Sequence, residues 1–152
     1  MATNTMINPA SGMNADLAKS GIGIEHIRSR PLGATERHAT GTPQHVEGYV
    51  IPYFDINEKV IPFYRVRLFD WKPKYRQVAN QPNHIYFPPG FRKALENARC
   101  IIITEGEKKA ACATRFGYAA VGVSGTDSWR NRILSMPKDS ELKQGKDGRM
   151  LA

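Results

Sequence analysis

The sequence has few cysteines and no long apolar run, and these absences argue against a disulfide-rich protein and against a membrane-spanning one. Its two cysteines, Cys100 and Cys112, lack Cys-x-x-Cys spacing, so we expect core thiols in a reducing compartment and no disulfide framework. The four histidines are scattered and form no pair at metal-ligand spacing, which argues against a zinc site. No segment approaches the roughly 20 apolar residues that span a bilayer, and the N-terminus lacks the pattern of a signal peptide. We therefore expect a cytoplasmic protein with no membrane partner.

Positive charge exceeds negative charge. The chain of 152 residues contains 22 lysines and arginines against 14 aspartates and glutamates, which gives a net charge of +8. A hydrophobic fraction of 41% and a charged fraction of 24% are typical of globular proteins. The length suffices for one domain, or for a small domain with part of another. The basic balance favours a polyanionic partner, most commonly nucleic acid, although it also occurs as a plain solubility feature.

A predicted βαβ unit occupies the chain from residue 101 onwards. The three isoleucines at 101–103 form a β-branched run, which predicts a strand buried on both faces, as in a parallel sheet. Helix-forming residues follow, and Gly117 is placed to end that helix in a left-handed C-cap. The apolar run 118–123 predicts a second, parallel strand. Both strand ends, at Glu105 and Ser124, should then face one crevice, where ligands bind in open α/β sheets.

The string Ile-Ile-Ile-Thr-Glu-Gly-Glu-Lys-Lys-Ala at 101–110, with Val-Ser-Gly at 123–125, resembles the Toprim domain of primases, topoisomerases and some nucleases. More narrowly, it is similar to the Toprim-like domain, of the DUF3854 type, in primase-like replication proteins of phages and plasmids. The resemblance implies nucleotidyl or phosphodiester chemistry, with Glu105 as the catalytic acid or base and a later Asp-x-Asp pair holding magnesium. A carboxylate with a pKa of about 4.3 is anionic at neutral pH, so this role needs tuning or metal assistance.

The chain departs from the family after Gly125, because no third apolar strand ending in Asp-x-Asp follows. Asp139 and Asp147 are too far apart to form the pair. We expect either the N-terminal part of a longer protein or a reduced form without the metal site, and we favour the first. Glu105 is then a candidate Mg²⁺ ligand whose partners are absent from this chain.

The residues around Glu105 are candidates for phosphate binding. Glu107 complements the dipole of the helix that begins there, the lysines beside it can reach a phosphate, and the turn after the second strand can bind an anion through its amides. A solvent-exposed helix start and a simple turn explain the same residues equally well. The candidates are Gly106, Lys108, Lys109, Ser124 and Gly125.

A basic α+β module is predicted ahead of this unit. Its predicted elements are a disordered tail at 1–14, a helix at 15–22, a connecting loop at 29–47, hairpin strands at 49–55 and 60–68, a short strand at 84–87 and a helix at 91–97. No flexible linker separates this module from the βαβ unit, so we expect the two to pack together. The predicted fold class is α+β, with a small antiparallel hairpin module at 15–98 followed by a partial Toprim-like unit at 99–152.

Basic and aromatic residues alternate in and after the second hairpin strand. The pleat places Arg65 and Arg67 on one strand face, from which they should project together. Such interleaving suits single-stranded nucleic acid, because bases stack on rings while cations follow the phosphates. A solvated strand face with aromatic cover is the alternative. The nucleic-acid candidates are Arg65, Arg67, Lys74, Tyr75 and Arg76.

The leading functional prediction is a primase-like DNA replication protein of phage or plasmid type, in a bacterial or phage-infected host cell. Its expected partners are single-stranded DNA and a replicative helicase, and its expected cofactor is Mg²⁺. Two alternatives stay open: a non-catalytic module that binds single strands or recruits a helicase, and a Toprim-type nuclease. Primer synthesis and strand cleavage use the same acidic residue and metal, so the sequence does not separate them.

Overall fold

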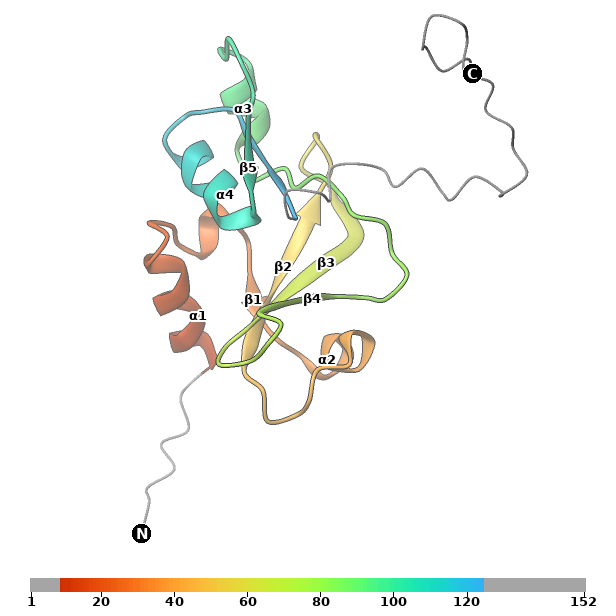
Figure 1. The fold of residues 1–152 in the computed structure, drawn as a ribbon. Helices are drawn as coiled ribbons and strands as arrows, with labels where there is room; N and C mark the ends of the chain where they lie inside the picture. The colour runs from red at the N-terminus through yellow and green to blue at the C-terminus, as the bar shows by residue number, and fades with distance from the viewer. Residues whose placement is uncertain (1–8, 125–152) are drawn as a thin grey trace, which may run out of the picture.

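The computed structural model describes residues 9–124, and these form an α+β fold with two sheets (Figure 1). An antiparallel sheet of four strands comes first, followed by a parallel sheet of two strands, which confirms the predicted class and the predicted βαβ unit. The antiparallel strands, in spatial order, are β1 (Arg30–Pro31), β2 (Gly48–Phe54), β3 (Val60–Leu68) and β4 (Tyr75–Gln77). The parallel strands are β5 (Ile102–Glu105) and β6 (Ala120–Val123).

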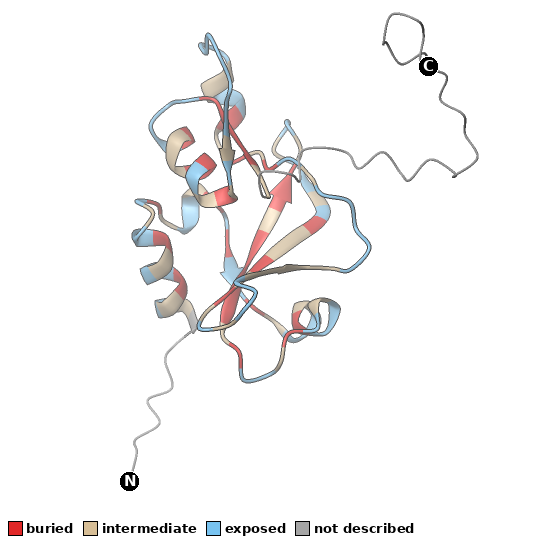
Figure 2. Ribbon diagram, viewed as in Figure 1, coloured by how far each residue is buried: buried red, intermediate tan, exposed pale blue. Residues whose placement is uncertain are grey.

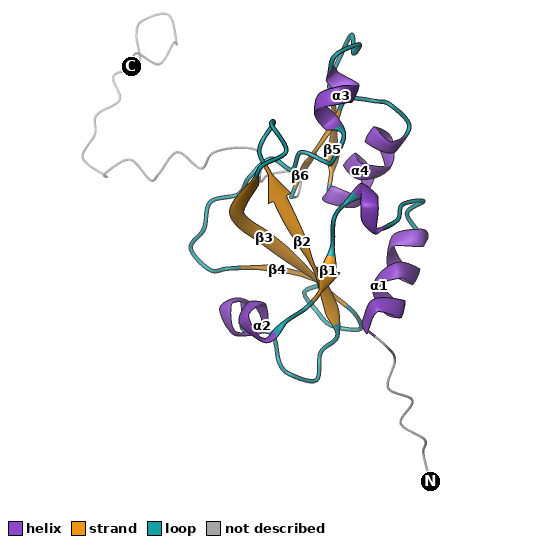
Figure 3. Cartoon of the chain, turned by 180° about the vertical axis from the view of Figure 1, so that it is seen from behind, coloured by secondary structure: helices purple, strands orange, loops and turns teal. Residues whose placement is uncertain are grey.

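Helices cover both sides of the antiparallel sheet. The helices of the described range are α1 (Pro9–Ala18), the 3₁₀ helix η1 (Ile24–His26), α2 (Ala34–Thr40), α3 (Phe91–Leu95) and α4 (Glu107–Arg115), of which α3 packs on the parallel unit through Phe91. Both ribbon views place α1 and α4 on one side of this sheet and α2 on the other (Figures 1 and 3). Strand β2 is therefore buried along nearly all of its length, whereas β3 is buried only at Phe63, Val66 and Leu68 (Figure 2).

The hairpin of β2 and β3 forms where the sequence predicts it. Val50 pairs with Val66, and the turn between the strands is closed by the Asp55 carboxylate, which accepts the backbone N–H groups of Asn57 and Lys59 at 2.8 and 3.0 Å. An aspartate that binds amides further along the chain is a common means of closing a turn. Local turn chemistry and strand alternation thus suffice to place this element.

The predicted tail and loop of the N-terminal half contain regular structure, so these two predictions are wrong within the described residues. Helix α1 begins at Pro9, and Met13 and Leu17 bury its inner face against the sheet. Its sequence includes glycine and serine and has little helix propensity, so packing rather than propensity holds it. The segment 29–47 contains β1 and α2, and α2 ends at Gly41, whose φ of 62° is the left-handed conformation of a C-cap.

The prediction that the isoleucine strand is buried on both faces is also wrong. Ile101, Ile102 and Ile103 are 51%, 37% and 71% exposed, and the neighbouring Cys100, predicted in the core, is exposed as well. Strand β5 pairs only with β6 among residues 9–124, so it is an edge strand there. A continuous apolar run predicts a strand, but it does not show whether another layer of the protein covers that strand.

Two backbone hydrogen bonds join the parallel unit to the preceding segment. Tyr86 and Gly122 exchange N–H···O bonds of 2.8 and 2.9 Å, and this single bridge replaces the short strand predicted at 84–87. The buried Tyr86 ring packs on Tyr53 of β2 with centroids 5.1 Å apart. The expected packing of the module against the βαβ unit is therefore confirmed. None of the helices in the described range is long and apolar enough to cross a membrane.

Candidate active site

Glu105 is the last residue of β5 and lies at the carboxyl edge of the parallel sheet. It pairs in register with Val123, and the next backbone amide, that of Gly106, donates to the Val123 carbonyl at 2.8 Å. Glu105 and Ser124 therefore lie at the same sheet edge, as the βαβ topology predicts. The Glu105 side chain is exposed, and within residues 9–124 its carboxylate has no hydrogen-bond or ion-pair partner. This carboxylate is open to contact with a ligand.

Gly106 makes the turn that ends β5 and begins α4. Its φ of 89° lies in a region that other residues adopt only with strain. The turn also passes close to β6, since a Cβ on Gly122 would lie 3.0 Å from the Gly106 carbonyl oxygen. The Glu-Gly pair thus places an exposed carboxylate directly before a tight strand-to-helix turn.

Glu107 lies two residues after Glu105 in the chain. Its side chain is buried, with only 2% of its surface exposed, whereas that of Glu105 is exposed. Glu107 Oε1 accepts hydrogen bonds from the Tyr53 hydroxyl at 2.6 Å and from Arg65 Nη1 at 2.9 Å. Burial raises the pKa of Tyr53, and the Glu107 carboxylate raises it further, so the phenol remains a donor at physiological pH. This cluster fastens the first turn of α4 to β2 and β3.

The sequence predicts Glu107 in a charged, exposed helix start, whereas the structure buries it. The signal that indicates burial is helical spacing, because Ala110, Ala111 and Thr114 follow Glu107 at i+3, i+4 and i+7 and are buried with it. A carboxylate on the apolar face of a helix needs a partner, which Arg65 of β3 supplies. The pattern thus carried evidence for a buried acid in this helix.

A second charged cluster lies beside the first and centres on Asp16 of α1. The Asp16 carboxylate accepts hydrogen bonds from Tyr49 at 2.8 Å, Lys108 at 2.9 Å and Arg67 at 3.4 Å. Burial alone would raise the pKa of Asp16, but these bonds and the two positive charges outweigh it and hold the pKa below its ordinary value of 3.8. Four elements, α1, β2, β3 and α4, meet at this carboxylate.

Removing the Asp16 carboxylate should destabilise the protein in a pH-dependent way. Because the pKa of Asp16 is lowered by folding, its stabilisation is complete above about pH 4 and is lost as the pH falls through the folded-state value. We expect Asp16→Asn to lower the free energy of unfolding by about 1–3 kcal/mol at pH 7, as for hydrogen bonds to charged groups. The difference from wild type should be smaller at pH 3. Urea unfolding at both pH values measures this, and an equal difference at both would contradict the assignment.

Arg65 and Arg67 share one face of β3, as predicted, but that face is covered. Each side chain is 15% exposed and is paired with a carboxylate, Glu107 or Asp16. Both guanidinium groups also lie over the Tyr75 ring, 4.9 and 5.3 Å from its centroid. The expectation that these arginines project from an open sheet surface is therefore wrong, because α1 and α4 pack there. Tyr75 in turn is half-buried between them.

The other predicted phosphate and nucleic-acid residues divide into two groups. Arg76 donates to the Gly41 carbonyl and Lys108 to Asp16, so both take part in internal contacts. Lys74 and Lys109 are exposed, and within the described residues their side chains have no hydrogen-bond or ion-pair partner. Gly106 forms the turn described above and Ser124 follows β6 at the same edge, while Gly125 lies outside the described residues. Ligand binding by any of these residues stays a prediction.

The described residues do not fit a magnesium site. Among residues 9–124 there is no group of three or more His, Cys, Asp or Glu side chains that could hold a metal ion. Glu105 therefore belongs to no such group there, and Asp139 and Asp147 lie outside the described residues.

Comparison with known proteins gives a family match and a structural neighbour. A family described as Domain of unknown function (DUF3854) matches residues 91–150, a segment that contains β5, α4, β6 and Glu105. This match confirms the DUF3854 part of the sequence resemblance, while the Toprim-like assignment stays a prediction. No curated protein matches the chain.

The structural neighbour is the DnaG catalytic core. The chain is 16% identical to it with a TM-score of 0.50, and the alignment covers 78% of this chain and 49% of the DnaG chain. This chain therefore spans about half the length of its structural neighbour. At this level of identity the likeness shows a common fold, and the fold includes the antiparallel module as well as the parallel unit.

Proposed function

We propose that this chain supplies the acid/base residue, and part of the strand-binding surface, of a primase-like replication protein of phage or plasmid type. The observation that carries the proposal is the exposed Glu105 carboxylate, which has no partner among residues 9–124 and lies at the carboxyl edge of a parallel βαβ unit. Its segment lies within the DUF3854 match, and 78% of the chain aligns with the DnaG catalytic core in fold. Both findings support a replication role.

In the proposed reaction, Glu105 acts as the general base during nucleotidyl transfer. A terminal 3′-hydroxyl attacks the α-phosphorus of a nucleoside triphosphate, the new phosphodiester bond forms and pyrophosphate leaves. Glu105 takes the proton from the attacking hydroxyl. Lys109, exposed in the first turn of α4, offers a positive charge to the phosphates. Magnesium, which the family resemblance implies, would need carboxylate ligands in addition to Glu105.

The exposed lysines are expected to carry the electrostatic part of strand binding. Single-alanine variants of Lys74 and Lys109 should each reduce the slope of log affinity against log salt by about 0.7 for single-stranded DNA, because each removes one phosphate contact. Fluorescence anisotropy with a labelled 20-mer across a salt series measures this slope.

The matched control is Lys59→Ala, since Lys59 is an exposed lysine of the β2–β3 turn with no proposed contact. It should leave the slope unchanged. If all three variants lower the slope equally, the binding reflects net charge alone. If wild type fails to bind at low salt, the proposed strand-binding role is wrong.

A second candidate function is a non-catalytic strand-binding module that recruits a helicase. One observation that favours it is the lack of a metal-ligating group in the described range. Another is that four of the predicted nucleic-acid residues form ion pairs or hydrogen bonds within the protein: Arg65, Arg67, Arg76 and Lys108. Glu105→Gln separates the two functions, because only the catalytic one loses chemistry. A nuclease would use the same carboxylate with water as the nucleophile, and strand shortening in place of extension would identify it.

A further inference from the structure

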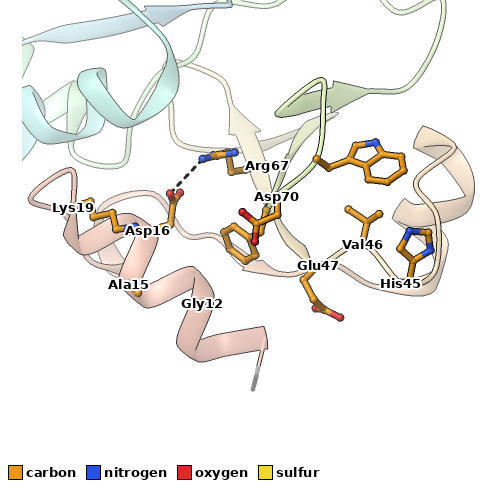
Figure 4. Close-up of a pocket in the computed structure, with 11 residues that line it drawn as sticks. Gly12, Ala15, Asp16, Lys19, His45, Val46, Glu47, Arg67 and Asp70 are labelled. Carbon is orange, nitrogen blue, oxygen red and sulfur yellow. Dashed lines mark hydrogen bonds and ion pairs between the residues drawn. The ribbon is translucent and has the colours of Figure 1, made fainter. Parts of the chain in front are cut away.

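A cavity of about 640 Å³ lies on the antiparallel module, on residues that the proposed chemistry does not use (Figure 4). Three segments line it: helix α1, the segment before β2, and the end of β3 with the turn after it. Its volume is within the range of small-ligand sites, which is about 300–1,000 Å³. The lining residues include Ala15, Asp16, Lys19, His45, Phe69 and Trp71.

One end of the cavity is aromatic. The His45 and Trp71 rings meet edge to face with centroids 5.6 Å apart, while Phe69 lines the cavity from its place beside Tyr49 and Gly12. The indole nitrogen of Trp71 is buried and has no hydrogen-bond partner within the described residues. The aromatic rings, rather than this buried nitrogen, are the part of the wall that a ligand can contact. Planar, apolar walls of this kind suit an aromatic ring system.

The other end of the cavity is charged. Figure 4 shows Lys19 and Asp16 at the end opposite His45. Asp16 is already compensated by Arg67 and Lys108, whereas the exposed Lys19 ammonium has no ion-pair partner within the described residues. An anionic group at this end would therefore meet a positive charge that is not already paired.

Carboxylates lie between the two ends. Asp70 and Glu47 line the cavity, and Asp70 has no side-chain partner in the described range. Ionised carboxylates only accept hydrogen bonds, so they favour a ligand whose ring edge carries N–H donors. Cytosine, adenine and guanine present an exocyclic amino group with two N–H donors, whereas thymine presents only its single ring N3–H between two carbonyl acceptors.

We propose that this cavity takes one base of a single DNA strand, with amino-bearing bases favoured over thymine and the adjoining phosphate beside Lys19. The inference rests on the proposed binding of single-stranded DNA and adds the site and base class. Stacking of a base on an aromatic side chain is worth about 1–3 kcal/mol, which corresponds to roughly 5- to 150-fold in affinity.

The test uses the full chain carrying Trp129→Phe, which leaves Trp71 as the only tryptophan of the two. Labelled dT20 and a dT20 analogue with five central cytosines are titrated, and strand anisotropy and Trp71 emission are recorded together. We expect the cytosine strand to bind about tenfold more tightly than dT20 and to change the Trp71 emission. Heparin, a polyanion without bases, should bind without that change.

A substitution that fills the cavity is compared with the same substitution outside it on the same helix. Ala15 is an exposed residue of α1 that lines the cavity, and Ala18 is exposed on the same helix outside it. Ala15→Leu should weaken the cytosine strand about tenfold and leave heparin binding unchanged, whereas Ala18→Leu should change neither. Strand binding that leaves Trp71 emission unaltered, or that tolerates Ala15→Leu, overturns the base site while the proposed function stands. A strand that does not bind at all overturns both.

Discussion

Glu107→Ala is expected to lower the free energy of unfolding by about 3–5 kcal/mol, the cost of breaking a buried ion pair by removing one partner. The substitution leaves the Arg65 guanidinium, 15% exposed, without its carboxylate, and leaves the Tyr53 hydroxyl without its acceptor. Domains of this size are stable by about 5–15 kcal/mol, so the variant should be close to unfolding at moderate denaturant. Urea unfolding followed by circular dichroism measures the loss.

Glu105→Ala is the matched control for this prediction. It removes a carboxylate only two residues away, but an exposed and unpaired one, so its effect should stay within about 0.5 kcal/mol. Replacing both Glu107 and Arg65 by apolar residues should recover much of the lost stability, because no buried charge then lacks a partner. Equal effects of Glu107→Ala and Glu105→Ala would contradict the structural role of the buried pair.

The buried pair has a functional consequence, because it fixes the helix that follows Glu105. The antiparallel sheet holds Glu107 through Tyr53 and Arg65, and Lys108 binds Asp16 of α1. The position of the Glu105 carboxylate therefore depends on the N-terminal module as well as on its own strand. Changes at Glu107 should therefore affect the proposed activity indirectly, through stability.

Local sequence signals were sufficient for the hairpin and for the βαβ unit. Two strand-like runs at 49–55 and 60–68, separated by a four-residue turn, gave β2 and β3, and two apolar runs around a helix ending near Gly117 gave β5, α4 and β6. The same topology placed Glu105 and Ser124 at one sheet edge. These features depend on residues close together in the chain, which is why the sequence could predict them.

Features that depend on long-range contacts were missed or wrong. Arg65 looks like a solvated strand residue until α4, 42 positions later, brings Glu107 to it. Helix α1 has a poor local signal because packing of Met13 and Leu17 stabilises it. The isoleucines of β5 were predicted to be buried, although no described layer covers them. In each case the burial of a residue depends on whether a segment distant in sequence packs against it. The spacing of apolar residues within one segment does not identify that partner.

Glu105→Gln should lower nucleotide incorporation by about 10²–10⁴-fold, the usual contribution of a positioned acid or base. Glutamine has nearly the same shape but does not exchange the proton, so folding should be unchanged. Loss of one negative charge near the phosphates should leave strand affinity equal or slightly higher. The control is Glu96→Gln, which neutralises an exposed carboxylate at the end of α3 and should leave activity at the wild-type level.

The most direct test of the proposed chemistry is template-directed incorporation of labelled nucleotides on single-stranded DNA in the presence of Mg²⁺, with strand binding measured in parallel. We expect incorporation by wild type and by Glu96→Gln, and loss of incorporation with retained strand binding in Glu105→Gln. Incorporation that survives Glu105→Gln would contradict the assignment of Glu105 as the acid/base residue, whereas a wild-type chain that binds the strand but adds no nucleotide would support the non-catalytic strand-binding module.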